Sequence, residues 1–331
     1  MSDDALEGAA PPAATTPAIV DVAVGVLIRG DGSFLLAQRP EGKPMAGYWE
    51  FPGGKLEPGE SIFDAMVREF DEELGLHIVR AQPWVQRVVT YPHATVRLHF
   101  WRSFGEGRGW RQEPRSREGQ DYRWERLDRL TTEPWLEGAL PVKRWMLLPS
   151  KYAISNASAL GVDPFLDALD RHLADGSVAL LQLREPAMGE AAFAPLFDAV
   201  KARCTQYGAR LLVNSGHPKT YWSLSDGVHL SSRHLMHVDA RPNVDWCFAS
   251  VHDAAELAKA GALGLDAAVL GPVGPTASHP DAELLGWTGF AAITRSTAIP
   301  VYALGGLAAG DLDAARDAGG HGVAMIRAAW R

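Results

Sequence analysis

The chain has 331 residues, and at roughly 150 residues per domain this length predicts two domains. Hydrophobic residues make up 47% of the chain and charged residues 22%, a composition that excludes a disordered or a collagen-like protein. The net charge of −8 is shared equally between residues 1–150 and residues 151–331, which argues against a basic nucleic-acid-binding arm.

The N-terminus and the cysteines indicate where the protein works. Residues 1–17 are rich in Ala, Pro and Thr and lack the basic start and apolar run of a signal peptide, so we expect a disordered tail. No apolar run reaches the roughly 18 residues of a membrane span. Cys204 and Cys247 have neither disulfide-scaffold nor zinc-site spacing. These features predict a cytoplasmic protein that binds neither membrane nor nucleic acid.

The first domain is expected over residues 18–148 and has the pattern of a mixed α/β fold. A hairpin, an amphipathic helix and two aromatic strands precede a charged loop. These elements are expected over residues 19–28, 34–37, 62–74, 83–91, 94–104 and 108–129. Ser61 with Asp64 predicts the start of the helix, and Gly75 predicts its end.

The second domain is expected over residues 151–331, after a boundary near Pro149. Short apolar runs recur there with helical segments between them, as in a repeated βα unit. The expected strands cover residues 151–155, 179–185, 210–215, 227–231, 247–251, 266–273, 300–306 and 322–327. Eight such units predict a closed (β/α)₈ TIM barrel, so the chain as a whole is of the α/β class.

The residues with the clearest chemistry lie on the predicted helix 62–74. Glu69, Glu72 and Glu73 have i, i+3 and i+4 spacing, so their carboxylates project from one face and repel one another. Mg²⁺ binds carboxylate oxygens and substrate phosphates, and the Gly53-Gly54 turn before the helix allows close backbone approach. A solvated acidic face is the alternative for the triplet alone.

The surrounding residues decide between these alternatives. They fit the pattern G-x5-E-x7-R-E-U-x-E-E-x-G-U, where U is apolar, without exception. The matching residues are Gly54, Glu60, Arg68, Glu69, Phe70, Glu72, Glu73, Gly75 and Leu76. This pattern resembles that of the Nudix hydrolases, and Glu50-Phe51-Pro52 before it and Glu118-Gly119-Gln120 after it resemble the MutT-type 8-oxo-dGTP diphosphatases.

The resemblance implies a Nudix α/β/α sandwich with a mixed sheet and a Mg²⁺-dependent activity, with Mn²⁺ as the alternative metal. The expected reaction hydrolyses 8-oxo-dGTP, or a related oxidised purine nucleotide, to the monophosphate and pyrophosphate. Such a reaction serves nucleotide-pool sanitation and so DNA replication and repair.

The resemblance also implies roles for individual residues. The expected metal-binding residues are Gly53, Gly54, Glu69, Glu72, Glu73 and Glu118. Either Glu69 or Glu118 is the expected general base. The i±4 spacing of Arg68 from Asp64 and Glu72 independently predicts that it braces the acidic face, and we count it with the expected catalytic residues. The expected nucleotide-binding residues are Arg39, Glu50, Phe51, Pro52, Gly53 and Lys55.

One position departs from the subfamily pattern and leaves the preferred nucleotide open. Ala139 stands where the MutT-type enzymes usually have an Asn that pairs with the oxidised guanine edge. Losing a buried amide that reads the base weakens discrimination by about 1–3 kcal/mol.

The second domain carries motifs at the expected ends of its strands. They include Gln182-Leu183-Arg184, Asn214-Ser215, Ser250-Val251-His252 and Gly305-Gly306, and together they resemble thiamine-phosphate synthase and its relative TenI, a thiazole tautomerase. The resemblance implies a site for a thiamine-related phosphate. Its expected residues are Gln182, Arg184, Asn214, His252, Gly305 and Gly306.

Several positions of this second domain depart from the synthase pattern. Pro186 and His279 replace lysines, and Ser215 and His234 replace metal-binding aspartates. Pyrophosphate with Mg²⁺ needs anionic ligands and cationic clamps. Three alternatives follow: a synthase, a metal-independent tautomerase, and a non-catalytic barrel that regulates the hydrolase. The oligomeric state and any coupling between the domains stay open.

Overall fold

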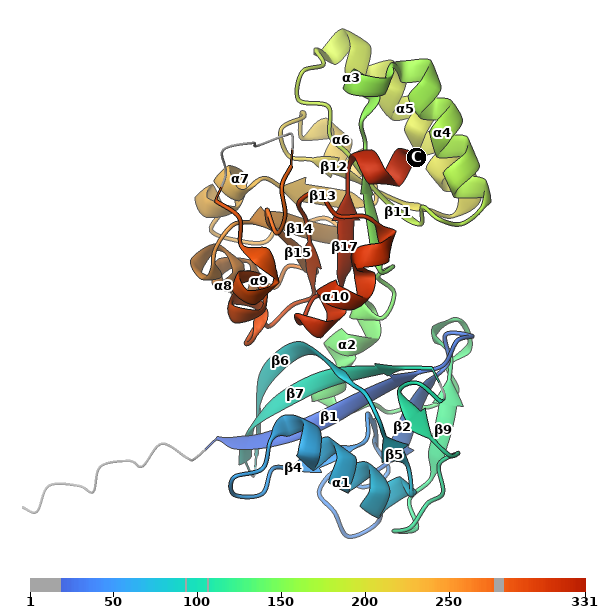
Figure 1. Ribbon diagram of the computed structural model, residues 1–331, viewed down its shortest axis with the longest axis vertical. Coiled ribbons are helices and arrows are strands. Elements are labelled where there is room, and N and C mark those ends of the chain that lie inside the picture. Colours follow the sequence, from blue (N-terminus) through green and yellow to red (C-terminus); the bar gives the residue numbers. More distant parts are fainter. Residues whose placement is uncertain (1–18, 93, 106, 277–282) are drawn as a thin grey trace, which may run out of the picture.

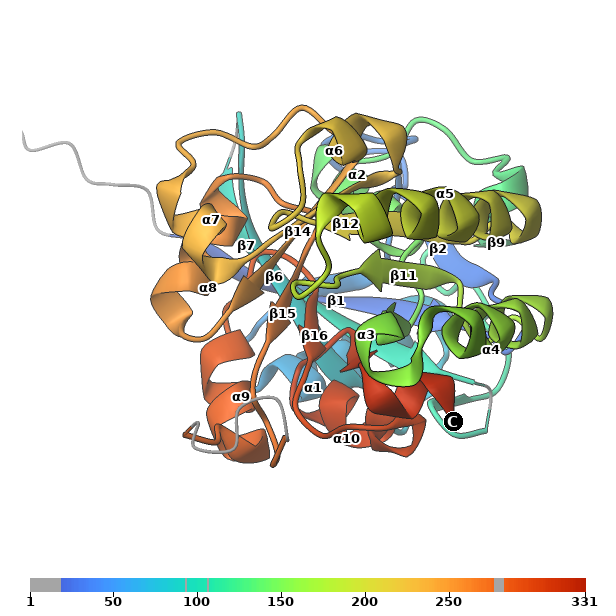
Figure 2. The same ribbon diagram turned by 90° about the horizontal axis from the view of Figure 1, so that it is seen from above.

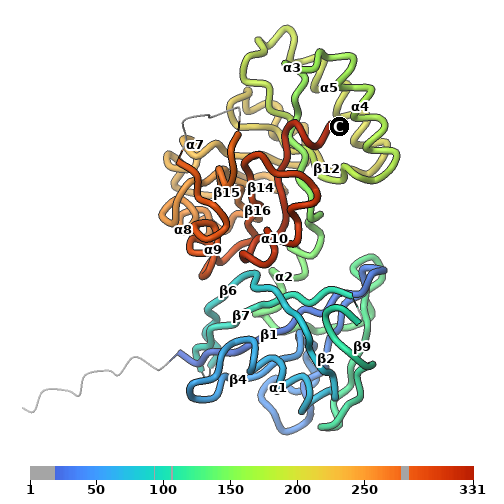
Figure 3. The backbone as a smooth tube through the Cα atoms, viewed as in Figure 1, coloured from blue at the N-terminus to red at the C-terminus, as the bar shows by residue number. Residues whose placement is uncertain are grey.

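The computed structural model describes residues 19–92, 94–105, 107–276 and 283–331, and it shows two units stacked end to end (Figure 1). The backbone passes from one unit to the other through α2 (Leu140–Trp145) (Figure 3). The tail predicted over residues 1–17 and the predicted site position His279 lie outside the described residues. No helix in the described ranges is long and apolar enough to cross a membrane.

The N-terminal unit is built on a mixed sheet, which has seven strands within the described residues. Their order is β3-β2-β1-β7-β6, with β4 beside β1 and β9 beside β2. The strands are β1 (Val20–Ile28), β2 (Phe34–Gln38), β3 (Trp49–Glu50), β4 (Gly53–Lys55), β6 (Gln82–Tyr91), β7 (Ala94–Phe104) and β9 (Tyr122–Glu125). Because β1 runs parallel to β7 and antiparallel to β2 and β4, the predicted mixed sheet is confirmed.

Alternation along β1 places one core on each face of this sheet. Ala23 and Leu27 are buried on the face covered by α1 (Ile62–Leu74), whereas Val24 and Val26 enter a core on the opposite face. Successive side chains of a strand point to opposite faces, so the apolar run of β1 serves both cores. The acidic helix is thereby fixed against the sheet.

The prediction of a charged loop over residues 108–129 is wrong in part. Two strands lie within it: β8 (Trp110–Arg111) pairs with β5 (His77–Ile78), and β9 pairs antiparallel with β2. In β9 the Tyr122 and Trp124 side chains pack against the core under α1, while arginine and glutamate alternate with them. The alternation is too short and too charged to stand out from the surrounding loop.

The C-terminal unit is the predicted closed barrel, with eight parallel strands within the described residues. They are β10 (Lys151–Ile154), β11 (Leu180–Leu183), β12 (Arg210–Asn214), β13 (Gly227–Leu230), β14 (Trp246–Val251), β15 (Ala267–Leu270), β16 (Val301–Ala303) and β17 (Gly322–Met325). Each lies within or one residue outside its predicted run. Figure 2 shows the helices arranged around the strands.

The helices around this barrel differ in length, from the 4 residues of α3 to the 18 residues of α5. They are α3 (Ala157–Leu160), α4 (Val162–Ala174), α5 (Glu190–Tyr207), α6 (Thr220–Leu224), α7 (Ser232–His237), α8 (Ala254–Ala262), α9 (Gly286–Thr294) and α10 (Leu312–Asp317). Short 3₁₀ turns are η1 (Leu127–Arg129) and η2 (Glu137–Ala139) in the first unit, and η3 (Ala309–Asp311) and η4 (Arg327–Trp330) in the second.

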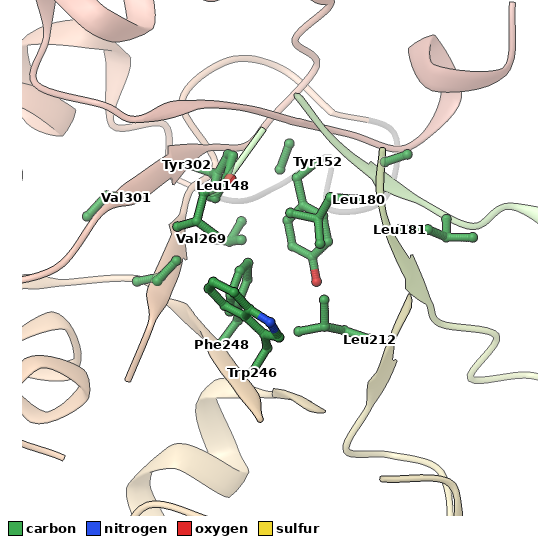
Figure 4. Close-up of a cluster of buried hydrophobic side chains, with 14 of the residues drawn as sticks. Leu148, Tyr152, Leu180, Leu181, Leu212, Trp246, Phe248, Val269, Val301 and Tyr302 are labelled. Carbon is green, nitrogen blue, oxygen red and sulfur yellow. The ribbon is translucent and has the colours of Figure 1, made fainter. Parts of the chain in front are cut away.

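The interior of the barrel is a packed core. The ring of Tyr152 lies 5.4 Å from that of Phe248 and 5.6 Å from that of Tyr302, centroid to centroid (Figure 4). The Tyr302 hydroxyl donates a hydrogen bond of 2.6 Å to the carbonyl of Pro149. Side chains therefore fill the barrel, as in other folds of this kind, and binding sites lie at its ends.

The two units contact each other through the end of the barrel where the strands begin. The Trp84 ring of β6 lies 5.7 Å from that of His321, just before β17, and Arg144 of α2 donates to the buried carboxylate of Asp266 at 2.6 Å. The carboxyl ends of the barrel strands consequently point away from the N-terminal sheet.

Candidate active site

A pocket of about 530 Å³ opens on the N-terminal unit between β1, β4, β7 and the segment that follows β2. Its lining contains most of the residues predicted from the MutT-type pattern. They are Arg39, Glu50, Phe51, Pro52, Gly53, Gly54, Lys55, Glu69 and Glu73. Arg68, Glu72 and Glu118 do not line the pocket. Arg68 and Glu118 form ion pairs with the lining residues Glu69 and Lys43, whereas Glu72 pairs with Arg68.

The ends of α1 determine which carboxylates enter the pocket. The helix begins where the Ser61 hydroxyl accepts a hydrogen bond from the backbone N–H of Asp64, and it ends at Gly75 in the left-handed conformation, φ 60°, as predicted. The side chains of Glu69 and Glu73, one helical turn apart, are only 16% and 17% exposed.

The third carboxylate of the acidic face points elsewhere. The Glu72 side chain is 57% exposed and pairs with Arg68 at 3.2 Å. The three glutamates therefore share the side of the helix that the sequence predicts, but only two of them are half-enclosed by the pocket.

Arg68 ties the acidic residues to the turn before the helix. Its guanidinium donates to Glu60 at 2.9 Å, to Glu69 at 2.8 Å and to the carbonyl of Lys55 at 3.0 Å. The Glu60 carboxylate is the largest of the causes that raise the pKa of Arg68 above its usual value. Arg68 thus positions the Glu69 carboxylate, as expected of a bracing residue.

Lys43 joins the site although its sequence context gives no sign of it. Its ammonium lies 3.1 Å from the Glu118 carboxylate and 3.8 Å from that of Glu73. The residue belongs to the irregular segment between β2 and β3, where a single lysine has no periodic or motif signal. Only the fold brings this segment over α1.

Glu73 is the most strongly perturbed carboxylate of the site. Burial raises its pKa to about 7, Lys43 opposes the shift, and the charges of Glu69, Glu118 and Glu50 reinforce it. Four carboxylates therefore interact electrostatically around one point of the pocket. Such crowding favours any cation that can share their oxygens.

The donor chemistry of the site fits a hard divalent cation. A Cβ built on Gly54 would lie 2.0–2.2 Å from the Glu69 carboxylate oxygens, so glycine is what lets this carboxylate touch the turn. Within the described ranges no three acidic, histidine or cysteine side chains are already spaced to hold a metal. Arg68 and Lys43 instead neutralise the carboxylates, and the side chains would turn to bind a metal.

The other end of the pocket combines a charged pair with apolar side chains. The Arg39 guanidinium donates to Glu50 at 2.6 Å, and burial raises the pKa of Glu50 above its usual value. Phe51 is 3% exposed and packs edge-on against Phe100, with ring centroids 6.3 Å apart, so it belongs to the core as well as to the pocket lining. Ala139 lines the same end.

In the barrel, two of the predicted ligand residues form a buried polar chain. Asn214 donates to the Gln182 amide oxygen at 3.1 Å, and Gln182 donates to the Tyr152 hydroxyl at 3.3 Å. His229 continues the chain, 3.1 Å from that hydroxyl. Burial is the first cause that lowers the pKa of His229 to about 3, and Arg184 adds to it, so this histidine is neutral.

The remaining predicted ligand residues lie at the carboxyl ends of the barrel strands. Arg184 follows β11 and is exposed, and Gly305 and Gly306 follow β16 with φ of 128° and 64°. His252 follows β14, and its Nδ1 donates to the Gly271 carbonyl at 2.9 Å. This hydrogen bond places the proton on Nδ1 and leaves Nε2 as the acceptor in the neutral ring.

The departures from the synthase pattern form contacts of their own. The Ser215 hydroxyl and His234 Nδ1 lie 2.6 Å apart, at the two positions where the synthase pattern has metal-binding aspartates. Pro186 is exposed after β11. A hydrogen-bonded Ser–His pair presents no carboxylate oxygen to a metal.

Comparison with known proteins places both halves of the chain in families. Residues 20–146 match the model of the NUDIX domain, and residues 151–329 match that of thiamine monophosphate synthase. The 8-oxo-dGTP diphosphatase of Haemophilus influenzae is 35% identical over 106 residues, which are 32% of this chain and 75% of that protein. The chain is a Nudix hydrolase fused to a member of the thiamine monophosphate synthase family.

Two further relatives refine this assignment. The putative thiamine-phosphate synthase 2 of Aquifex aeolicus is 32% identical over 183 residues, 55% of this chain and 97% of that protein. The CTP pyrophosphohydrolase of Escherichia coli is 42% identical over 78 residues, 24% of this chain, and the match spans only 58% of that protein. The Nudix half is thus similar to proteins whose names give different nucleotide substrates.

Proposed function

We propose that the Nudix domain is a divalent-metal-dependent nucleoside triphosphate diphosphatase whose preferred substrate is 8-oxo-dGTP or a related oxidised purine nucleotide. The observation that carries the proposal is the joint presence of Glu69, Glu73 and Lys55 in one pocket with the Arg39–Glu50 pair. Carboxylates for a metal, a cation for phosphates and a polar end for a base are the parts that such a reaction needs.

The expected metal-binding set is Gly53, Gly54, Glu69, Glu72, Glu73 and Glu118, with Mg²⁺ as the metal and Mn²⁺ as the alternative. When bound, the metal supplies neutralisation of phosphate charge and a water of lowered pKa. Lys43 would exchange its carboxylate partners for phosphate oxygens as the substrate enters, and Lys55 would contact the phosphates beside it. Both lie at the pocket, and Lys43 already spans its acidic side.

The proposed reaction is an in-line displacement at phosphorus. The oxygen of a water forms a bond to phosphorus, the bond to the departing pyrophosphate breaks, and one proton of the water passes to a carboxylate. Glu69 and Glu118 are the two candidates for that carboxylate. Glu69 accepts a hydrogen bond from Arg68, whereas Glu118 is paired with the exposed Lys43.

Substrate preference depends on the far end of the pocket. Arg39 offers donors and Glu50 offers acceptors, while Ala139 supplies no base-reading amide. The Haemophilus influenzae relative is named for 8-oxo-dGTP and the Escherichia coli relative for CTP. A panel of 8-oxo-dGTP, dGTP, CTP and dCTP therefore tests the preference, and equal kcat/KM for oxidised and unoxidised dGTP would contradict it.

The diphosphatase itself is tested by Glu73→Gln in the full-length protein. We expect pyrophosphate release to fall by more than about 100-fold, because an amide cannot replace a carboxylate ligand. Glu57→Gln, on the exposed turn before α1, is the matched control and should keep the wild-type rate. A full rate in Glu73→Gln would exclude the proposed metal site.

For the barrel, the hydrogen bond of His252 to the Gly271 carbonyl supports a second proposal. The barrel binds a thiamine-related phosphate at Gly305, Gly306 and Arg184, and His252 Nε2 transfers a proton on the ligand, as in a tautomerase. Neither Ser215 nor His234 offers a carboxylate to a metal, so this proposal needs no metal.

Calorimetry on the full-length protein with thiazole phosphate and thiamine phosphate tests this proposal. We expect heat of binding that Arg184→Gln abolishes and that His252→Asn preserves. Tautomerisation should be lost in both variants, in the first because the ligand does not bind and in the second because no proton is transferred. Absence of heat with either ligand would contradict the proposed site, and binding without turnover would favour the regulatory alternative.

A further inference from the structure

A second cavity lies between the two domains, away from both sites described above. Its volume is about 110 Å³, and among the described residues its lining includes four arginines: Arg80, Arg102, Arg108 and Arg316. Arg102 belongs to β7 of the Nudix sheet and Arg316 to α10 of the barrel, so both domains build it. We call it the arginine cavity.

Arg102 is the buried centre of this cavity. Its side chain is 3% exposed, and its terminal nitrogens donate to the carbonyls of Gly320 at 2.8 Å and His321 at 3.3 Å. Its Nε has no hydrogen-bond partner, and no described carboxylate forms an ion pair with it. A buried guanidinium with neither counter-charge nor full hydrogen bonding is costly, which indicates a missing partner.

Arg316, on the barrel side of the cavity, also lacks a close counter-charge and a full set of hydrogen bonds. Its guanidinium stacks over the Phe104 ring at 4.0 Å, and its Nε is also buried without a hydrogen-bond partner. The contact with Asp313 is 4.0 Å long, and that carboxylate is 74% exposed. Burial lowers the pKa of Arg316, Asp313 opposes the shift and the Arg80 charge adds to it.

The other charged residues of the cavity do not neutralise its excess of positive charge. Arg80 is already paired with Asp317, at 2.7 Å and 2.8 Å to the two carboxylate oxygens, and Gln82 donates to the same carboxylate at 2.7 Å. Arg108 is exposed at the rim. In the part of the chain that the structure describes, the lining thus offers Arg102, Arg108 and Arg316 a single carboxylate, the exposed Asp313.

We propose that the arginine cavity binds one phosphate-sized tetrahedral oxyanion, such as inorganic phosphate, and that the bound anion bridges the two domains. Guanidinium groups match phosphate oxygens in geometry and charge. A volume of about 110 Å³ exceeds the roughly 30 Å³ share of one water several times, and it is too small for a nucleotide. The proposal is independent of the hydrolase activity.

Calorimetry of the full-length protein with inorganic phosphate, in chelator and without divalent metal, tests the site. We expect one phosphate per chain, at least about tenfold weaker binding in Arg316→Gln, and about threefold weaker binding in Arg108→Gln, whose charge is at the exposed rim. Arg171→Gln, at an exposed position of α4, is the matched control and should bind as the wild type does.

Further measurements decide which anion binds and at which site it binds. Sulfate should compete with phosphate, whereas the binding of dGMP should be unaffected by Arg316→Gln. A folded Arg316→Gln variant that binds phosphate like the wild type, or a wild type that binds no phosphate at millimolar concentration, would overturn the proposal. If Arg316→Gln does not fold, unchanged binding in Arg108→Gln overturns it, and loss only in Arg184→Gln places the anion at the barrel mouth.

Discussion

The Nudix pocket and the carboxyl end of the barrel lie in domains whose relatives are named for phosphate-containing compounds, but the two regions differ in the charge of their buried groups. In the Nudix pocket, half-buried Glu69 and Glu73 lie among further carboxylates and are neutralised by Arg68 and Lys43. In the barrel, Asn214, Gln182, Tyr152 and His229 form a neutral chain. Of the two, the Nudix pocket alone concentrates carboxylates, the groups that divalent cations prefer as ligands.

The same contrast gives the two domains opposite responses to pH. The folded state keeps Glu73 protonated up to about pH 7, because its pKa is raised, so its contribution to stability falls as the pH rises from the ordinary glutamate pKa of 4.5 towards 7. The folded state keeps His229 neutral down to about pH 3, so its contribution is present above 6.5 and is lost as the pH falls towards 3.

The largest expected effect that tests this contrast comes from Gly54→Ala. The added methyl would occupy the position of the Glu69 carboxylate, 1.9–2.2 Å from its atoms, and the side chain would have to turn away from the turn and from Arg68. Because Gly54 does not have positive φ, the backbone tolerates alanine. We expect kcat of the proposed hydrolase to fall by about 100-fold or more with the fold retained.

Gly30→Ala is the control for this substitution, since a Cβ there meets nothing within 4 Å. Pyrophosphate release and thermal unfolding of both variants would be measured together. Wild-type kcat in Gly54→Ala would show that the proposed reaction does not need close contact between Glu69 and the turn. The buried carboxylates would then not distinguish the Nudix pocket from the barrel in catalysis.

Much of the fold follows from the sequence because strong local patterns coincide with buried elements. The helix at residues 62–74 has its capping residues and apolar face within a few positions, and the barrel strands are short apolar runs between polar segments. The sequence does not predict strand β9, because its four residues alternate aromatic and charged side chains and so resemble the surrounding loop. Its partner β2 is also far away in sequence, so no hairpin pattern indicates the pairing.

The site was predictable to the extent that it lies within one motif. Residues from Gly53 to Glu73 are close in the chain, so spacing alone brings their groups together. Lys43 and the arginine cavity depend on contacts between distant segments, and no local pattern signals them. The turning of Glu72 to solvent depends on its ion pair with Arg68, which spacing alone does not determine.

The smaller expected effect tests the barrel side of the comparison through His229→Gln. A histidine that stays neutral in the folded state loses stability relative to the unfolded chain, where it takes up a proton below about pH 6.5. Because each pKa unit corresponds to about 1.4 kcal/mol, its contribution to the free energy of unfolding is about 2 kcal/mol smaller at pH 5 than at pH 7. Glutamine does not titrate and can still bond to Tyr152 or Ser250, the two neighbours of the His229 ring.

Urea unfolding at pH 7 and pH 5 measures this difference. The wild type should lose about 2 kcal/mol more than His229→Gln between the two pH values. His77→Gln, at an exposed position of the Nudix domain, should lose as much as the wild type. Equal losses in the wild type and His229→Gln would mean that His229 takes up a proton within the folded barrel. The hydrogen-bonded side chains around Gln182 and Asn214 would then include a positive charge at acid pH. The barrel end, like the Nudix pocket, would contain a buried group that titrates.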